Sequence, residues 1–452
     1  MRTYFGIHNH TYYSNIRLLD STNKPKDLID KAIELGMNGI AITDHECLSA
    51  HMEANQYAKE IQKSYPDFKV ALGNEIYLVD ERGPGQKYYH FILIAKDEIG
   101  HKALRELSST AWYNSYTDRG MERVPTTKEE LATIVQKYPG HLIATTACRG
   151  GELSTWALLL ARAREVNDTV SVKIYEQYMV DFLQWSYNLF NDDFYIECAP
   201  STDEEQILIN QTLLKLCNSI NINIVVGTDA HYLTKEDRFV HKAYLNSKDG
   251  DREIDDFYEF TYLMNYDECE NLLSLSFEGN KYIASAIIDN TKKIQDKIQN
   301  YSLERKQIIP KVNVEVYPRQ WSFMNKGTLA SYTNKFPLIT QLCLSEEVQE
   351  RYWINECLKE LINKNQWNDE YLNRIEIEAD IIKYIGEKLD DCLFAYFNTF
   401  KHYIDLFWEC GSIVGPGRGS ATGFLSNYLL GITQLDPIRW NLPYWRLTLI
   451  NY

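Results

Sequence analysis

The chain has 452 residues, enough for two or three domains with their own cores. Its net charge of −16 excludes a uniformly basic surface, so any contact with nucleic acid must be confined to a local groove. No stretch approaches the roughly 18 apolar residues of a membrane helix, and no apolar signal core opens the chain. Nine cysteines without Cys-x-x-Cys spacing argue against a disulfide framework. We therefore expect a cytoplasmic protein with no membrane partner.

The first apolar run, residues 4–7, ends in two histidines one residue apart, His8 and His10. Alternate side chains of a strand share a face, so both imidazoles can point at one metal ion. A lone pair of this kind is more often two half-exposed strand histidines. The rest of the chain must decide between these interpretations.

Short apolar runs and helical patterns alternate up to about residue 240. With the opening run, they predict seven strands separated mostly by helices, which indicates a parallel α/β architecture, and the regularity favours a barrel over an open sheet. In such barrels the functional groups lie where strands end. The further strands are predicted at 39–43, 68–79, 88–95, 141–146, 194–197 and 222–226, and helices at 26–36, 102–114, 128–138 and 204–220, with two more within 152–191.

Metal-binding side chains recur beside these runs. Imidazole, thiolate and carboxylate together suit zinc, manganese or iron, and so many donors predict two or three ions if carboxylates bridge them. Such a cluster suits phosphate-ester hydrolysis, since it provides hydroxide at neutral pH and positive charge for the phosphoryl oxygens. The candidate ligands are His8, His10, Asp20, His45, Glu75, His90, Cys148, Asp229 and His231, of which Glu75 and His90 lie within predicted strands rather than at their ends.

Several of these residues have a structural alternative. His90 fits a core histidine, Cys148 a small buried hydrophobe, Asp20 a turn residue and Glu75 an exposed strand position. Asp44 fits a helix cap or a partner of a ligating histidine. The joint pattern is stronger, because five of the ten histidines fall in the set. We expect surface or structural roles for His51, His101, His141, His241 and His402.

In order and spacing these residues resemble the polymerase-and-histidinol-phosphatase (PHP) domain that opens bacterial C-family replicative DNA polymerases. The resemblance implies a distorted seven-stranded barrel, a trinuclear metal centre and often a metal-dependent 3′–5′ exonuclease. Some family polymerases have lost ligands and keep the domain for structure only, whereas this sequence retains all nine. His8, His10, Asp229 and His231 are the implied catalytic residues. The matching motifs are His8-x-His10, Leu18-Leu-Asp20, Thr43-Asp-His45, Gly73-Asn-Glu75, His90, Cys148 and Asp229-x-His231.

The second half of the chain has a different pattern. A polar, acidic stretch at 246–260 predicts a surface linker. The segment 292–311 is locally basic, which fits contact with a phosphate backbone and fits a solvated helix face at least as well. Helices are predicted at 282–299, 346–362, 368–386 and 394–410.

A glycine-rich segment, VGPGRGSATG, occupies residues 414–423. Glycines let backbone N–H groups approach a phosphate, and arginine and serine add donors, but a plain glycine-rich turn explains the segment equally well. It matches neither the Walker nor the Rossmann pattern. Residues 415–420, with LLGITQLDP at 429–437, resemble the palm segment that helps hold the incoming nucleotide in DNA polymerase III alpha subunits. The resemblance implies that Gly417, Arg418, Gly419 and Ser420 bind nucleotide phosphates and that 412–414 forms the strand before them.

The chain departs from this family at its end. The family's catalytic palm aspartates follow shortly after this point, whereas the chain stops at Tyr452 and residues 446–452 drift from the expected pattern. Asp436, before a proline, reads as a turn residue. We therefore expect a truncated, split or frameshifted product that cannot extend a primer alone.

The predicted fold class is α/β: a distorted seven-stranded PHP barrel, then a mostly helical thumb and a partial α+β palm. The expected domains are 1–240 (PHP), 241–280 (linker and start of the palm region), 281–400 (thumb-like) and 401–452 (partial palm). The expected cofactors are two or three Zn, Mn or Fe ions, with Mg for the polymerase part. The expected partners are a DNA primer–template and dNTP, with other replisome subunits or a second, palm-bearing polypeptide as further candidates. The alternatives are a phosphatase for small monoesters, which would not need the helical region, and a non-catalytic remnant with a structural metal site.

Overall fold

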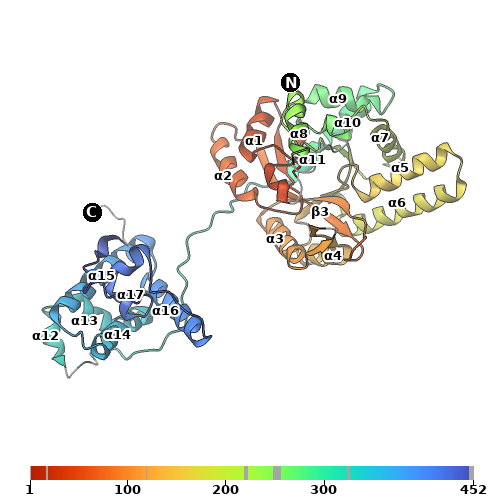
Figure 1. Cartoon of the computed structure of the whole chain (residues 1–452). Coiled ribbons are helices and arrows are strands. Elements are labelled where there is room, and N and C mark those ends of the chain that lie inside the picture. The colour runs from red at the N-terminus through yellow and green to blue at the C-terminus, as the bar shows by residue number, and fades with distance from the viewer. Residues whose placement is uncertain are drawn as a thin grey trace. The chain divides into compact units, whose positions relative to one another are not determined.

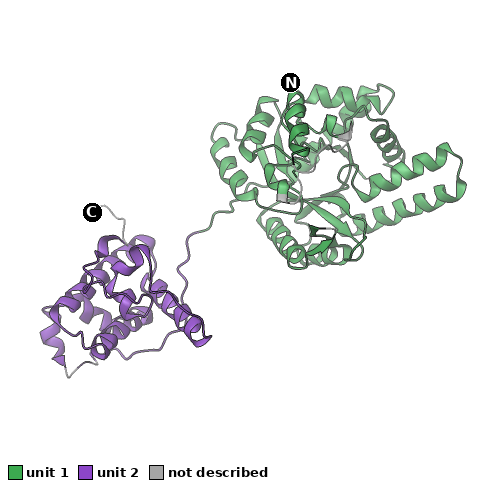
Figure 2. Ribbon diagram, viewed as in Figure 1, with its two compact units in different colours: residues 1–305 green, residues 306–452 purple. Residues whose placement is uncertain are grey.

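The computed structural model describes residues 2–16, 19–118, 120–217, 222–247, 256–321, 323 and 326–446. Leu18, the end of the predicted helix at 218–220, most of the predicted linker and the last six residues lie outside this part. The chain forms two compact units, Met1–Arg305 and Lys306–Tyr452 (Figure 2). Each unit is described by itself.

The sheet of the first unit contains the seven strands expected from the sequence, in the order β1-β2-β3-β4-β8-β9-β10. Beyond the last pair, Asn9 and Ala230 form a parallel bridge, and the His10 N–H donates to the Ala230 carbonyl at 2.9 Å, so the sheet curls into a nearly closed barrel. The strands are β1 (Phe5–Gly6), β2 (Gly39–Ile42), β3 (Lys69–Val79), β4 (Tyr89–Ala95), β8 (Leu142–Thr145), β9 (Phe194–Cys198) and β10 (Ile224–Val226).

One strand differs from the all-parallel expectation. β4 runs antiparallel to both β3 and β8. The segment 80–88 that joins β3 to β4 is too short for the crossover of a dozen or more residues that a parallel pair needs. The reversal puts the start of β4 beside the carboxyl ends of the parallel strands. Next to them, β7 (Thr126–Thr127) pairs with the end of β3, and β5 (Tyr116–Asp118) pairs with β6 (Met121–Arg123) as a separate hairpin.

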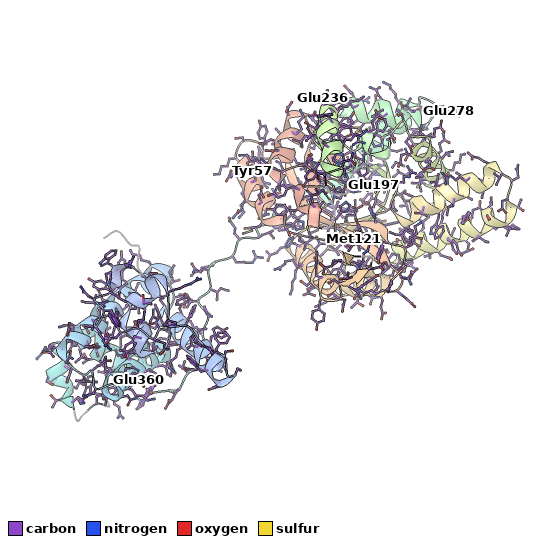
Figure 3. All side chains as sticks on the ribbon, in the orientation of Figure 1. Tyr57, Met121, Glu197, Glu236, Glu278 and Glu360 are labelled. Atoms are coloured by element: carbon purple, nitrogen blue, oxygen red, sulfur yellow. The ribbon has the colours of Figure 1, made fainter. Side chains whose placement is uncertain are left out.

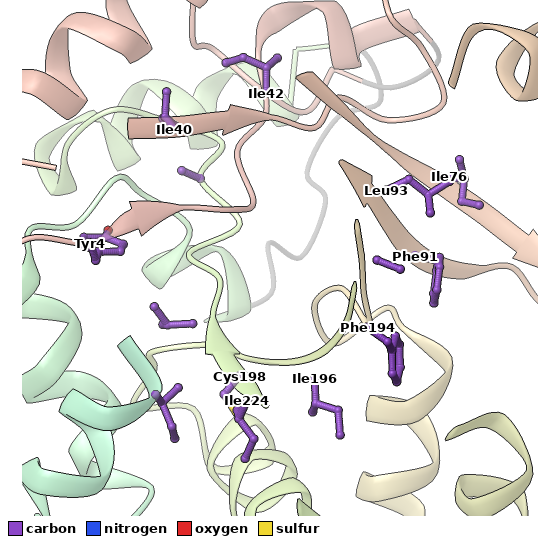
Figure 4. Packing of buried hydrophobic residues seen from close by; sticks show 14 of the residues in the cluster. Tyr4, Ile40, Ile42, Ile76, Phe91, Leu93, Phe194, Ile196, Cys198 and Ile224 are labelled. Atoms are coloured by element: carbon purple, nitrogen blue, oxygen red, sulfur yellow. The ribbon is translucent and has the colours of Figure 1, made fainter. Parts of the chain in front are cut away.

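The strands are apolar on both faces, which is why they appear as continuous hydrophobic runs in the sequence. One set of side chains, including Phe5, Ile92 and Tyr195, fills the barrel interior. The alternate set, including Ile40, Phe91 and Ile196, packs outward against the helices (Figure 4). Period-two alternation therefore builds two apolar layers from the same strands.

Helices surround this barrel (Figure 1). α11 brings Ile294 and Ile298 into the interior cluster, and the hydroxyl of Thr291 accepts from the Phe5 N–H. Because Phe5 begins β1, α11 covers the amino end of the barrel and leaves the carboxyl end for the polar residues. The helices are α1 (Pro25–Glu34), α2 (His51–Ile61), α3 (Glu98–Tyr113), α4 (Lys128–Lys137), α5 (Glu152–Glu165), α6 (Thr169–Phe190), α7 (Glu204–Cys217), α8 (Arg238–Leu245), α9 (Tyr266–Leu275), α10 (Lys281–Asp289) and α11 (Thr291–Lys297).

The second unit contains helices and no strands within its described part, although residues 306–321 and 411–418 are irregular. Its core surrounds the fully buried Trp353, and buried Glu378 accepts hydrogen bonds from the Leu425 and Ser426 N–H groups. The single helix expected at 282–299, in the first unit, is two helices that meet at Asn290. The strand expected at 412–414 in the second unit is absent from its described residues. Its helices are α12 (Leu329–Thr333), α13 (Pro337–Leu344), α14 (Val348–Asn363), α15 (Asp369–Leu389), α16 (Phe394–Glu409) and α17 (Leu425–Leu429).

Candidate metal centre

The carboxyl end of the barrel gathers the nine residues that the sequence singled out. His8 and His10 follow β1, and both are fully buried, with their Nε2 atoms 3.0 Å apart. The intervening Asn9 turns the other way and donates to the carbonyls of Gly6 and Ala41. The strand alternation predicted for this motif is confirmed.

Asp229 lies against this pair. Its Oδ1 is 3.0 Å from the Nε2 of both His8 and His10. Asp229 follows β10 and has a φ of +49°, a left-handed conformation that is uncommon for any residue but glycine. The backbone at this point is therefore shaped to bring the carboxylate back toward β1.

Glu75 occupies the middle of the cluster. Its Oε1 is 3.4 Å from His8 Nε2 and 3.0 Å from His90 Nδ1. Its Oε2 is 2.6 Å from His45 Nδ1 and 3.5 Å from His10 Nε2. Glu75 reaches this position from within β3 because β3 runs on past the end of β2, and His90 reaches it because β4 is antiparallel. Both within-strand residues thus belong to the same end of the barrel.

The remaining candidates complete the rim. Asp20 Oδ2 is 2.9 Å from His45 Nε2 and 3.4 Å from His231 Nε2. Cys148 Sγ lies 3.6 Å from His90 Nδ1. The structure therefore brings all nine predicted ligands together.

These residues form three overlapping groups of possible ligands. Within each group the three donor atoms lie within 4.8 Å of one another. Neighbouring groups share His10, Glu75 or His45, so the three groups form one continuous cluster of donors. The groups are His10, His45 and His231; His8, His10 and Glu75; and His45, Glu75 and His90.

The donor set fits divalent metal ions. Asp229 Oδ1, Glu75 Oε2 and His45 Nδ1 are buried and make no hydrogen bond of good geometry in the described part of the chain, although other ligand atoms lie within 3 Å of each. Atoms that converge without donor–acceptor alignment are what a metal site requires, and buried polar atoms otherwise find hydrogen-bond partners.

A second layer of side chains orients the ligands, and Glu197 is the member that sequence reasoning missed. Its Oε1 is 2.6 Å from His8 Nδ1, and its Oε2 accepts from the Thr145 hydroxyl at 2.7 Å. Glu197 is the last residue but one of β9 and lies in the first unit (Figure 3). The only sequence signal was an acid at the end of an apolar run, without a nearby histidine.

Asp44 acts on His10 through Ser14. The Ser14 hydroxyl is 3.1 Å from His10 Nδ1 and donates to Asp44 Oδ1 at 2.7 Å. Carboxylate partners of this kind fix the ring orientation of a ligating histidine. Of the two alternatives for Asp44, the structure supports the partner of a ligating histidine.

The cluster perturbs its own protonation. Burial lowers the pKa of His8, but the carboxylates of Asp229, Glu197 and Glu75 outweigh burial and raise the pKa well above its usual value. Burial, with the neighbouring His45 and His231, lowers the pKa of His10 to about 3.

Two histidines outside the cluster form a buried pair. His51 Nδ1 lies 3.1 Å from His101 Nε2, and His51 Nε2 lies 2.8 Å from the Gly73 carbonyl. This contact holds the start of α2 against β3, in keeping with the structural role expected for both residues.

The glycine-rich segment lies in the second unit. Gly417 and Gly419 have φ values of +104° and +62°, and a Cβ on Gly417 would lie 2.9 Å from Thr433 Cγ2. Arg418 is exposed and makes no ion pair within the described residues, and Ser420 is half-buried. The turn therefore needs glycine and presents a cation. Asp436 forms the predicted turn, since its Oδ1 accepts from the Ile438 N–H at 2.9 Å.

The chain is similar to known proteins along nearly its whole length. The PHP domain model matches residues 6–201, and the model of the bacterial DNA polymerase III alpha NTPase domain matches residues 339–448. A DNA-directed DNA polymerase of Bacillus phage SPbeta is 39% identical over 98% of this chain and 35% of its own length. The DNA polymerase III subunit alpha of Campylobacter jejuni is 29% identical over 99% of this chain and 35% of its own. The chain is homologous to bacterial DNA polymerase III alpha subunits.

This homologue spans about a third of the length of the curated relatives it matches. A solved amidohydrolase structure from Chromobacterium violaceum, 13% identical, covers 51% of the chain and 88% of its own length with a TM-score of 0.31, which supports no conclusion. Within the described residues, no helix has the length and apolar character needed to cross a membrane.

Proposed function

We propose that the first unit is a metal-dependent phosphodiesterase that removes nucleotides from the 3′ end of DNA, within a DNA polymerase III alpha-type protein. The observation that carries the proposal is the cluster of His and Glu donors in three overlapping groups at the carboxyl end of the barrel, with Asp229 and Asp20 beside them. Two relatives support DNA as the substrate. Both are named as DNA polymerases, and each is similar to nearly the whole of this chain.

We assign the nine clustered residues as ligands of two or three divalent ions, with zinc, manganese and iron as candidates. Bound ions supply positive charge for the phosphoryl oxygens and lower the pKa of water. Asp229, His8, His10 and His231 are the proposed catalytic residues. Asp229 and His10 flank the position for the attacking water, and the Asp229 carboxylate accepts its proton. The water oxygen bonds to the terminal phosphorus as the P–O bond to the 3′ oxygen of the penultimate nucleotide breaks. That oxygen takes up the proton held by Asp229, and a nucleoside 5′-monophosphate leaves.

In the second unit we propose that Gly417, Arg418, Gly419 and Ser420 bind the phosphates of a nucleotide with Mg²⁺. The exposed, unpaired guanidinium and the two left-handed glycines support this assignment. Titration of a fluorescent dNTP analogue tests it, with Arg418→Ala expected to weaken binding and Arg439→Ala, an exposed arginine outside the segment, as the control. Equal affinity in both variants would contradict the assignment.

A gel assay tests the phosphodiesterase. A 5′-labelled primer on a template, with Mn²⁺ or Zn²⁺, is incubated with the native chain and with a His8→Ala, Asp229→Ala double variant. Shortening by the native chain alone is the expected result. An unchanged primer in both lanes would overturn the assignment. Turnover of a small phosphate monoester in that case would favour a phosphatase, and bound metal without turnover would favour a structural site.

A further inference from the structure

The histidines of the candidate metal centre differ in the solvent exposure of their side chains. The side chain of His90 is 25% exposed, whereas those of His8, His10, His45 and His231 are at most 8% exposed. Among the histidines of the cluster, His90 is therefore the most accessible to a substrate, and it lies on the side of the barrel formed by β3 and β4. The side chains next to His90 on this side are the first that a substrate approaching it would meet.

The side chains beside His90 are aromatic. In the β3–β4 pair Tyr77 is opposite His90, and the two rings stack with centroids 4.7 Å apart and an interplanar angle of 11°. Tyr77 follows Glu75 by two residues and Tyr88 precedes His90 by two, so period-two alternation places all four on one face. The centroids of Tyr77 and Tyr88 are 6.4 Å apart. The face that holds the ligands therefore continues outward as a row of rings.

The β5–β6 hairpin extends this row. Tyr116 and Arg123 are directly opposite each other in the hairpin. The Tyr116 hydroxyl lies 2.6 Å from that of Tyr88, and the Arg123 guanidinium lies 5.3 Å from the Tyr88 ring centroid. All three tyrosines and Arg123 are half-buried. The tyrosine rings and the Arg123 guanidinium are planar groups on which other planar groups can stack.

The surface formed by the tyrosines and Arg123 carries charges of both signs, which favours stacking over charge attraction as the main way in which it would bind a nucleic acid. Arg123 makes no ion pair within the described residues, and its Nε is buried without a hydrogen-bond partner. Asp118 shares the same hairpin face and carries a charge opposite to that of Arg123. Nucleobases stack on aromatic rings whatever their sequence, whereas a small phosphate monoester has no planar group to place there.

We propose that Tyr77, Tyr88 and Arg123 form a stacking platform that holds the unpaired terminal bases of single-stranded nucleic acid and delivers its terminal phosphodiester to the metal centre. This inference rests on the proposed function and specifies its substrate as single-stranded nucleic acid. The three residues are positioning residues for the substrate.

The test uses the full chain with Mn²⁺ and a 5′-fluorescent oligothymidylate, compared with the same strand carrying two abasic sites at its 3′ end. Tyr88→Ala is expected to raise the KM for oligothymidylate by roughly tenfold, because stacking on one ring has about this effect per base. It should have little further effect on the abasic strand, which already lacks the stacking bases. Tyr88→Phe keeps the ring and should restore the KM, and Tyr282→Ala, on the 85% exposed α10 tyrosine, is the matched control.

Two further measurements separate the possible failures. Metal content is measured for each variant, and binding of the oligonucleotide is measured by fluorescence anisotropy, which needs no turnover. If Tyr88→Phe fails as Tyr88→Ala does, the hydroxyl contact to Tyr116 is what matters, and the platform is overturned. Hydrolysis with KM and binding independent of Tyr88 also overturns the platform and leaves the phosphodiesterase intact. Ring-dependent binding without hydrolysis overturns the phosphodiesterase and supports the platform.

Discussion

Substitution of Glu197 by glutamine tests the interior of the centre without touching a proposed ligand. The amide keeps the size of the side chain, and its oxygen can still accept from His8 Nδ1 while the Thr145 hydroxyl accepts from its NH₂ group. What is lost is the negative charge 2.6 Å from the imidazole, which raises the basicity of His8 as a ligand. The barrel should therefore fold normally and bind metal less tightly.

The expected loss is roughly 10- to 100-fold in metal affinity, or about 1.4–2.7 kcal/mol, with a similar loss of hydrolysis. Affinity is measured by competition with a chromophoric chelator, and folding by thermal unfolding in excess EDTA. Glu270→Gln is the matched control, because Glu270 is also buried in this unit but binds Arg2 and Ser285 instead. Unchanged metal affinity in Glu197→Gln would refute the reasoning. So would an equal loss of melting temperature with and without EDTA, since the effect would then concern folding alone.

Four further predictions follow from the same geometry. Chelation should lower the melting temperature of the first unit and leave that of the second unchanged. Ions at 100 times their Kd add about 2.7 kcal/mol to the free energy of unfolding of the unit that binds them. Equal shifts in both units would argue against a site in the barrel. Gly227→Ala should abolish tight metal binding, because its Cβ would lie 1.9 Å from Glu197 Oε1; normal binding would show that the carboxylate can move. Burial lowers the pKa of His51 to about 3 and that of His101 to about 4. As pH falls from about 6.5 toward 4, these histidines are protonated in the unfolded chain first, so the first unit should lose up to about 1.4 kcal/mol of stability per pH unit per histidine. In EDTA, the stability of a His51→Gln, His101→Gln variant should depend less steeply on pH. Glu378→Ala should destabilise the second unit by about 3–5 kcal/mol in urea unfolding, because it removes a buried carboxylate that binds the part-buried Arg374 and accepts from two N–H groups of α17. A loss below 1 kcal/mol would contradict this.

The candidate ligands could be grouped from the sequence because all of them except Asp20 interrupt or follow a predicted strand, and such positions are conspicuous. The seven strands were found for the same reason, since both of their faces are buried. The direction of β4 was missed although a signal existed: the segment 80–88 has no room for a helix, so its strands could only form an antiparallel pair. That reversal explains why His90, the one imidazole ligand at the start of a strand, joins the others.

Glu197 could not be found in this way. Its contact with His8 spans 189 positions, and an acid in a short strand has no periodicity of its own. The break between α10 and α11 was also hidden, because apolar residues continue at helical spacing on both sides of Asn290 while the Asn290 amide donates to the Ile224 carbonyl. Tertiary contacts, rather than local pattern, decide both cases.

The charged side chains of the centre and the apolar packing of the barrel make different contributions to the first unit. Burial alone would raise the pKa of Glu75, yet His90, His45 and His8 hold it well below its usual value, so the carboxylate is already paired with imidazoles when no ion is bound. Neighbouring carboxylates raise the pKa of His8 and of His45, so ions bound here would release protons from these two imidazoles. The barrel interior itself is filled by apolar side chains, and α11 closes the opposite end with Ile294 and Ile298. Because apolar packing rather than the donor cluster fills the barrel, and because His90 is partly exposed, this arrangement suits turnover better than a purely structural role.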